Sequence, residues 1–150
     1  MTDYLLDTNI VSLVAPGRRR SEADQRLADW IEVHGEELYL SVITTAEIFD
    51  GIAMARRTGA TQKAARLAEW WRELSHYWSS RILPIDLAVA VEIGRLLDVA
   101  RAAGEAPGFE DVAIAATASV HGMIVLTANE RHFRPLGVAF VNPLTELPSP

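Results

Sequence analysis

Four polar residues have types and positions that suit chemistry at one shared site. Asp7 follows the first apolar run of the chain, and Glu47 lies early in the helix expected after the second such run. Asp111 lies in the first turn of an alanine-rich helix, and Asn129 directly follows a wholly apolar run. Parallel sheets bind ligands just beyond the carboxyl ends of their strands. The pattern therefore predicts one crevice that gathers three carboxylates and an amide.

This combination of groups favours a divalent cation. Three carboxylates in one crevice repel one another unless a positive charge neutralises them. Mg²⁺ and Mn²⁺ prefer oxygen ligands, retain bound waters, and accept one or two carboxylates together with substrate phosphate. Such an ion lowers the pKa of a bound water and stabilises charge on a phosphoryl group.

Each of the four residues also has an ordinary structural explanation. Asp7 can cap the following helix, and a first-turn acid such as Asp111 is common and contributes only about 0.3–1 kcal/mol. Asn129 suits a turn, and a single exposed glutamate such as Glu47 needs no special role. The coincidence of all four at strand ends favours the metal site.

Apolar runs alternate with helical patterns along the chain. Strands are expected at 4–6, 38–41, 81–86, 123–127 and 138–141. The 123–127 run is expected to be central because it is wholly apolar, and 81–86 to be an edge strand because it contains proline. Helices are expected at 10–14, from 21 onward, 42–57, 61–78, 87–103, 109–121 and just after 129. The alternation predicts an α/β fold, a three-layer α/β/α sandwich with a central parallel sheet of four to five strands, in a single domain of residues 1–150.

The helix at 42–57 is expected to present two faces. The face assigned to the core consists of Thr45, Ile48, Phe49 and Ile52. The face that carries Glu47 also contains Ile43, Asp50 and Met54. In the next helix Trp70 and Tyr77 widen the apolar stripe, which fits either internal packing or a groove for a partner helix.

Composition narrows the class of protein. The net charge of −6 argues against a nonspecific nucleic-acid binder, although it allows an enzyme whose acidic centre has a basic rim. The absence of cysteine excludes disulfides and thiolate metal sites and favours a reducing cytoplasm. No signal peptide or membrane span is expected, so we expect a cytoplasmic location without a membrane partner.

The quoted residues resemble those of a known family. The chain is similar to PIN domains over essentially its whole length, and most similar to VapC-type, FitB-like toxins of type II toxin–antitoxin systems. The matching stretches, in order and with suitable spacing, are 4–12, 40–52, 111–118, 124–133 and 140–143.

The resemblance implies a Mg²⁺- or Mn²⁺-dependent endoribonuclease that hydrolyses RNA phosphodiester bonds. It implies a homodimer that a cognate antitoxin inactivates in a higher assembly, with operator DNA contacted only through the antitoxin. By matching motifs, Asp7, Glu47 and Asp111 form the acidic triad, and Asp7 and Asp111 are the direct metal ligands. The supporting polar residues are Thr8, Asn9, Thr127, Asn129 and Glu130.

The chain departs from the family pattern after its last buried strand. Asn129 stands where many PIN domains have an aspartate, and His132 stands where related sequences often have an aspartate before phenylalanine. The position of His132 near Asn129 allows it to approach the site. A missing fourth acid weakens a second metal position more than the first, unless Glu130 compensates.

Three other functions stay open at this stage. The first is a PIN-like domain that binds RNA or a protein partner with little or no catalysis. The second is an unrelated phosphate-binding or receiver-type domain, which would place a lysine near its acidic pocket. The only lysine, Lys63, is expected in a helix far from the strand ends. The third is a structural partner subunit with tryptophan-rich helices.

Overall fold

The computed structural model describes residues 1–149, and Pro150, the last residue of the predicted domain, lies outside them. The strands are β1 (Tyr4–Leu6), β2 (Leu38–Ser41), β3 (Ile82–Leu83), β4 (Ile124–Leu126) and β5 (Phe140–Val141). The α-helices are α1 (Thr8–Leu13), α2 (Glu22–Val33), α3 (Val42–Arg57), α4 (Thr61–Tyr77), α5 (Leu87–Ala102), α6 (Phe109–His121) and α7 (Glu130–Phe133). Short 3₁₀ turns are η1 (Gly35–Glu37), η2 (Ser79–Arg81) and η3 (Arg134–Leu136). Within residues 1–149, every helix is too short or too polar to cross a membrane.

The five strands form one parallel sheet in the order β3-β2-β1-β4-β5. The predicted parallel sheet is therefore confirmed, and β3 lies at an edge as its flanking proline indicated. The apolar strand β4 is interior, but the middle position belongs to β1, which pairs with β2 on one side and β4 on the other. The carboxyl ends of β1 and β4 are consequently neighbours.

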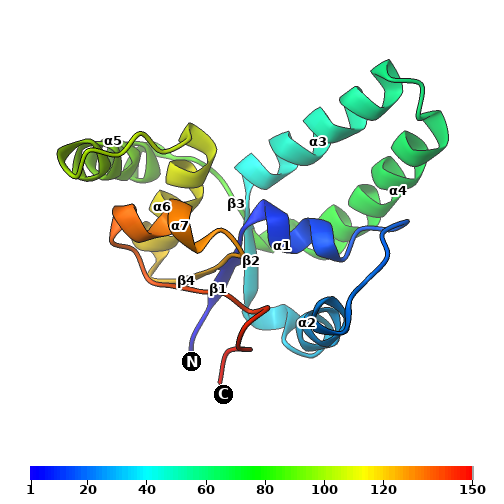
Figure 1. Cartoon of the computed structure of the whole chain (residues 1–150), viewed down its shortest axis with the longest axis horizontal. Coiled ribbons are helices and arrows are strands. Elements are labelled where there is room, and N and C mark those ends of the chain that lie inside the picture. Colours follow the sequence, from blue (N-terminus) through cyan, green and yellow to red (C-terminus); the bar gives the residue numbers. More distant parts are fainter. Residues whose placement is uncertain (150) are drawn as a thin grey trace.

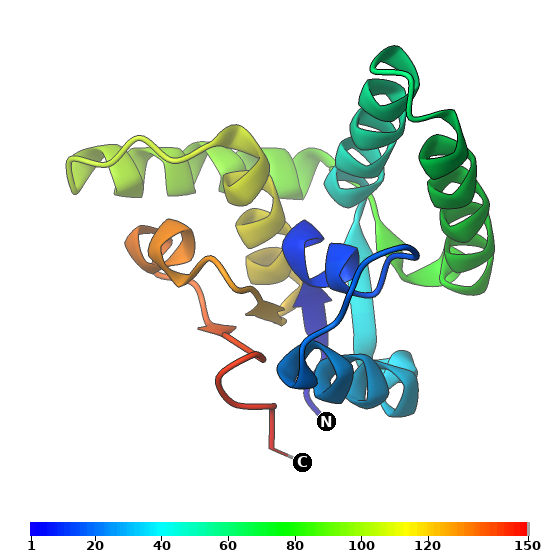
Figure 2. The same ribbon diagram turned by 45° about the vertical axis from the view of Figure 1, so that its right-hand side comes forward.

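Helices cover both faces of this sheet (Figure 1). Successive strand side chains point to opposite faces, so Tyr4 and Leu6 enter one core cluster and Leu5 enters the other. The first cluster packs against α1 to α4, and the second against α5, α6 and α7. The predicted three-layer α/β/α sandwich is confirmed. The second view shows α3 and α4 as a hairpin that projects from one side of the sheet (Figure 2).

Helix α3 places Glu47 close to the end of β2. The helix begins directly after the strand, and the hydroxyl of Ser41 accepts a hydrogen bond from the N–H of Ile43 at 3.1 Å. The assignment of Phe49 to the core was wrong, because 53% of this residue is exposed. The buried residues of α3 follow a helical repeat that leaves Phe49 to one side: Thr44, Ile48, Ile52 and Ala55.

Helix α6 carries Asp111 in its first turn and approaches the sheet closely. Its residues Val112 to Ala118 are all fully buried, and four of these seven are alanines. Small side chains let α6 lie against both β4 and α5. The position of Asp111 therefore depends on the small volume of this helix face.

We predict that Ala116→Leu destabilises the protein by about 1–3 kcal/mol, because the added carbon atoms would overpack this fully buried helix face. Ala116 is fully buried, whereas Ala90 on α5 is exposed and provides a matched control. Urea denaturation of both variants measures the free energy of unfolding. Equal stability of Ala116→Leu and Ala90→Leu would contradict close packing at α6.

Candidate active site

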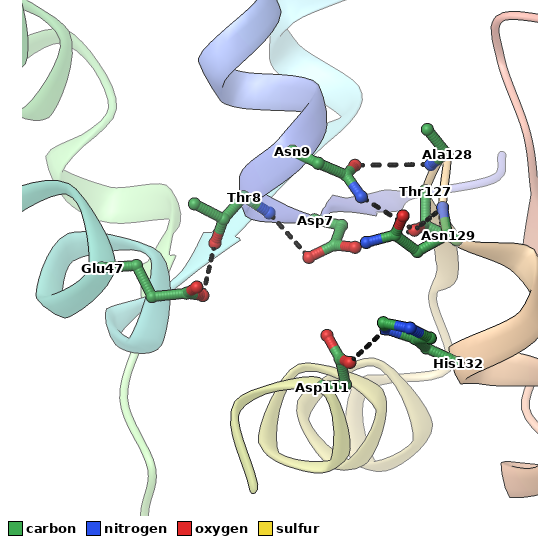
Figure 3. Close-up of polar contacts among 9 residues, drawn as sticks. All are labelled: Asp7, Thr8, Asn9, Glu47, Asp111, Thr127, Ala128, Asn129 and His132. Atoms are coloured by element: carbon green, nitrogen blue, oxygen red, sulfur yellow. Dashed lines mark hydrogen bonds and ion pairs between the residues drawn. The ribbon is translucent and has the colours of Figure 1, made fainter. Parts of the chain in front are cut away.

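Asp7 lies at the junction between β1 and α1, and its carboxylate is the centre of the site (Figure 3). One carboxylate oxygen, Oδ1, accepts the N–H of Thr8 at 2.8 Å, so Asp7 does cap α1. The other, Oδ2, accepts the hydroxyl of Thr127 at 2.7 Å. Only 3% of Asp7 is exposed. The capping role and the position in the site therefore coexist in one residue.

A network of polar contacts joins the end of β1 to the end of β4. The side-chain amide of Asn9 donates to the hydroxyl of Thr127 at 3.5 Å and accepts the N–H of Ala128 at 3.3 Å. The N–H of Asn129 also donates to the Thr127 hydroxyl, at 2.9 Å. The predicted supporting residues Asn9 and Thr127 are thus brought together with Asp7.

Glu47 reaches the site from α3 through Thr8. The hydroxyl of Thr8 donates to Glu47 Oε1 at 2.8 Å and lies 2.9 Å from the hydroxyl of Thr44. Because a hydroxyl has one proton, the Thr44 hydroxyl donates to Thr8 in this arrangement. Thr44 is fully buried, and its role was not predicted. Its position three residues before Glu47, on the same helix face, was the available signal.

Asp111 reaches the same space from α6, opposite α1 (Figure 3). Its Oδ2 lies 2.8 Å from Nδ1 of His132, so the prediction that His132 approaches the site is confirmed. The Asn129 side chain points toward the Asp7 carboxylate. Oε2 of Glu130, another predicted supporting residue, accepts a hydrogen bond from the Asn142 side chain at 3.3 Å.

Burial and neighbouring charges raise the pKa values of two of the acids. Burial raises the pKa of Asp7 to about 6, and the charges of Asp111 and Glu47 act in the same direction. The hydrogen bonds from Thr127 and Thr8 oppose this rise in the Asp7 pKa. Burial also raises the pKa of Glu47, against the hydrogen bond from Thr8. The three carboxylates are therefore close enough to disfavour one another's charge.

The side-chain oxygens at the site suit a cation that keeps several waters better than a cation that is enclosed by protein ligands alone. Among residues 1–149, no three histidine or acidic side chains converge tightly enough to enclose an ion. All the charged donors that face the centre are carboxylates, which suit hard cations that keep several waters. Asp7 and Asp111 approach the centre from opposite elements, so they are the two acids that would contact such an ion.

Among the hollows that border the acids, two also contain basic side chains. One, of about 360 Å³, is lined by Asp111, His132 and Arg131 among others. The other, of about 500 Å³, lies among α1, α3 and α4 and is lined by Thr8, Glu47 and Lys63 among others. The expectation that Lys63 lies far from the strand ends was therefore wrong. The α3–α4 hairpin folds back and brings Lys63 to the same hollow as Glu47.

Comparison with known proteins places this geometry in a family. The family model described as the PIN domain matches residues 4–137. "Plasmid stability protein StbB" of Pseudomonas syringae pv. tomato is 36% identical over 140 residues, covering 93% of this chain and 96% of that protein. "VapC ribonuclease Y4jK" of Sinorhizobium fredii is 34% identical, and "Toxin FitB" of Neisseria gonorrhoeae is 31% identical, with the same coverage of both chains.

A solved structure agrees with the sequence relatives. The crystal structure of FitAcB from Neisseria gonorrhoeae superimposes with a TM-score of 0.80 at 32% identity, covering 93% of this chain and 97% of that chain. The matched region includes all three acids and both supporting strand ends. The chain therefore belongs to the PIN-domain family, among its VapC- and FitB-like members.

Proposed function

We propose that this protein is a Mg²⁺- or Mn²⁺-dependent endoribonuclease that acts as the toxin of a toxin–antitoxin pair. The observation that carries the proposal is the buried Asp7 carboxylate, which faces Asp111 and Glu47 at the carboxyl edge of the sheet. A raised pKa beside two other acids is the electrostatic state that a bound cation relieves. The names of the relatives, a VapC ribonuclease and the toxin FitB, support the same function.

In this proposal Asp7 and Asp111 hold the cation, which when bound neutralises charge on the scissile phosphate and lowers the pKa of a water. Thr127 and the N–H of Thr8 orient the Asp7 carboxylate, and His132 orients Asp111. These contacts keep both carboxylates directed at the same space before substrate arrives. Pre-organised charged groups need little rearrangement during reaction.

Glu47 is the proposed proton acceptor. Its Oε1 is held by the Thr8 hydroxyl, which leaves Oε2 to take a proton from the attacking water. Burial raises the pKa of Glu47 toward neutrality, which makes it a better base at neutral pH than an ordinary glutamate. The Thr44 hydroxyl supports this arrangement by donating to Thr8.

The fourth position distinguishes this chain from four-acid sites. Asn129 presents an amide beside Asp7, and Glu130 is engaged by Asn142. We therefore propose one principal cation rather than two. The same observation favours the second candidate function, a PIN domain that binds RNA or a protein partner with little catalysis.

Partners follow from the toxin assignment. We propose that the protein acts on cytoplasmic RNA as a homodimer, and that an antitoxin inhibits it in a larger assembly. Contact with operator DNA is proposed only through that antitoxin. The relative named toxin FitB and the similar FitAcB structure support a two-component system.

Activity provides the first test. Asp7→Asn and Glu47→Gln should each reduce cleavage of a mixed cellular RNA about a hundred-fold or more in the presence of Mn²⁺. Asp98→Asn on α5 is the control, because Asp98 is exposed and lies outside the site. Absence of cutting by folded, antitoxin-free wild-type protein would instead favour the non-catalytic binder.

Stability provides a second test. A carboxyl whose pKa is 3.8 in the unfolded chain and about 6 in the folded protein stabilises the fold most below pH 3.8, and this contribution is lost as the pH rises through 6. A shift of about two units corresponds to about 3 kcal/mol, and replacing the acid sacrifices about 1 kcal/mol of hydrogen bonding. Without metal, Asp7→Asn should therefore be about 1–2 kcal/mol more stable than wild type at neutral pH.

Urea denaturation with a chelator at neutral pH and at about pH 4 measures this difference. The advantage of Asp7→Asn should disappear at the lower pH, because wild-type Asp7 is then protonated. A variant that is less stable than wild type at neutral pH would show that Asp7 acts mainly as a helix cap.

Metal addition provides a third test that needs no RNA. Mn²⁺ should raise the melting temperature of the wild type, since a ligand that binds only the folded state stabilises it by about 2.7 kcal/mol at a hundred times its Kd. Asp7→Asn and Asp111→Asn should lose most of this increase, whereas Asp98→Asn should keep it. An equal increase in all four proteins would place the cation elsewhere.

A further inference from the structure

The hollow among α1, α3 and α4 continues directly from the candidate active site. Thr8 and Glu47, which are hydrogen-bonded to each other, form its inner wall. Its outer wall comes from the loop after α1 and from α4. In Figures 1 and 2, α1 and this loop lie beside the α3–α4 hairpin. We propose that this hollow binds a nucleotide of single-stranded RNA next to the scissile phosphate, an inference that rests on the proposed ribonuclease function.

Positive charge gathers at the outer rim of the hollow. Arg18 and Lys63 line it, and both are exposed. Arg66 lies close by, because a Cβ placed on Gly17 in the same rim would be 3.6 Å from its Nη2 atom. Lys63 is the only lysine of a chain whose net charge is −6. Against this acidic background, three neighbouring cations form a local attraction for a phosphate backbone.

An aromatic side chain lines the same hollow as the basic residues and Glu47. Trp70 lines the hollow and is half-buried. Its ring lies 6.2 Å from that of the buried Trp71 at an interplanar angle of 63°, an edge-to-face contact that holds the indole in place. Trp70 also packs against the core through its buried part. A fixed aromatic surface beside cations is the arrangement on which unpaired bases stack.

The charges along the hollow favour one orientation of the bound RNA strand. Glu47 lies at the inner end, next to Asp7, and Lys63 lies toward the rim. Without a bound cation, the Glu47 carboxylate repels a phosphate at the inner end, whereas Lys63 attracts one at the rim. The base would thus lie against Trp70, with one phosphate at the rim and the scissile one at the acids. The volume of about 500 Å³ lies within the roughly 300–1,000 Å³ typical of ligand sites.

RNA explains more of these features than a protein partner does. An acidic peptide would also be attracted by Arg18 and Lys63, but it would meet Glu47 at the inner wall. A nucleotide strand has its phosphate drawn to the acids by the same cation that the proposed cleavage requires. The continuity of the hollow with the acids is therefore expected for a substrate.

RNA binding is measured apart from cleavage in the Glu47→Gln background, which removes the proposed proton acceptor but keeps Asp7 and Asp111, with Mg²⁺ present. The probe is a short fluorescein-labelled polyuridine RNA, followed by fluorescence anisotropy at several salt concentrations. Lys63→Ala should weaken binding and reduce the salt dependence by about 0.7 in log–log slope, the value for one lost single-strand phosphate contact. Trp70→Leu, which preserves apolar packing, should weaken binding about five-fold or more with little change in slope.

Matched controls come from the same helix. Arg72→Ala removes an exposed cation of α4 that pairs with Glu69, and Tyr77→Leu removes an aromatic ring that is 70% exposed. Neither residue lines the hollow. Both controls should bind the RNA as the Glu47→Gln parent does. Thermal denaturation of every variant verifies that Trp70→Leu remains folded.

The outcomes separate the subsite from the proposed function. If wild type cuts RNA but the Lys63 and Trp70 variants bind it like their controls, the subsite is wrong and the ribonuclease function stands. If these variants keep RNA binding but no longer bind a co-expressed antitoxin, the hollow is a binding site for the protein partner and the proposed RNA subsite is again wrong. If the wild type neither binds nor cuts RNA, both proposals fail.

Discussion

The hydrogen bond between the Thr127 hydroxyl and the buried Asp7 carboxylate is the contact on which the candidate site depends. It joins residues separated by 120 positions, at the ends of the two adjacent strands β1 and β4. The backbone of Asp7 adds a second link, because its N–H donates to the carbonyl of Leu126 at 2.9 Å. A carboxylate buried without such donors would be strongly disfavoured. The parallel pairing of β1 with β4 therefore stabilises the ionised form of Asp7.

Opposing effects act on the ionisation of Asp7 in this arrangement. Hydrogen bonds from Thr8 and Thr127 favour the charge on Asp7, while burial and the charges of Asp111 and Glu47 disfavour it. The result is an acid whose pKa is raised to about 6, close to neutrality but still mostly ionised there. Negative charge is concentrated at the edge of the sheet, where several hollows open. Like charges that are held together at the cost of folding stability are typical of functional sites.

The α3–α4 hairpin makes the two sides of the site chemically different. On its side, Thr44 and Glu47 connect through Thr8 to α1, and basic residues and Trp70 border the larger hollow. On the opposite side, α6 and α7 bring Asp111 against His132. The proposed metal ligands come from the end of β1 and from α6, whereas most of the proposed substrate-binding groups come from the loop after α1 and from α4. Substitutions on α4 therefore leave Asp7 and Asp111 unchanged.

The sequence by itself determined the alternation of strands and helices, the sandwich, the placement of Asp7 and Glu47 after strands, and the placement of Asp111 in the first turn of α6. These follow from local periodicity, because an apolar run with a polar end has few alternatives in a parallel sheet. Local periodicity did not determine that Phe49 is exposed, that Thr44 donates to Thr8, or that Glu130 turns toward Asn142.

Only the tertiary structure brought Lys63 and Trp70 to the hollow that contains Glu47. Their positions depend on how the hairpin between α3 and α4 folds back, which is set by the packing of residues such as Ala55, Ala64 and Trp71 in the shared core. A helix pattern specifies which face is apolar, but the neighbour of that face is decided by contacts between segments distant in the chain.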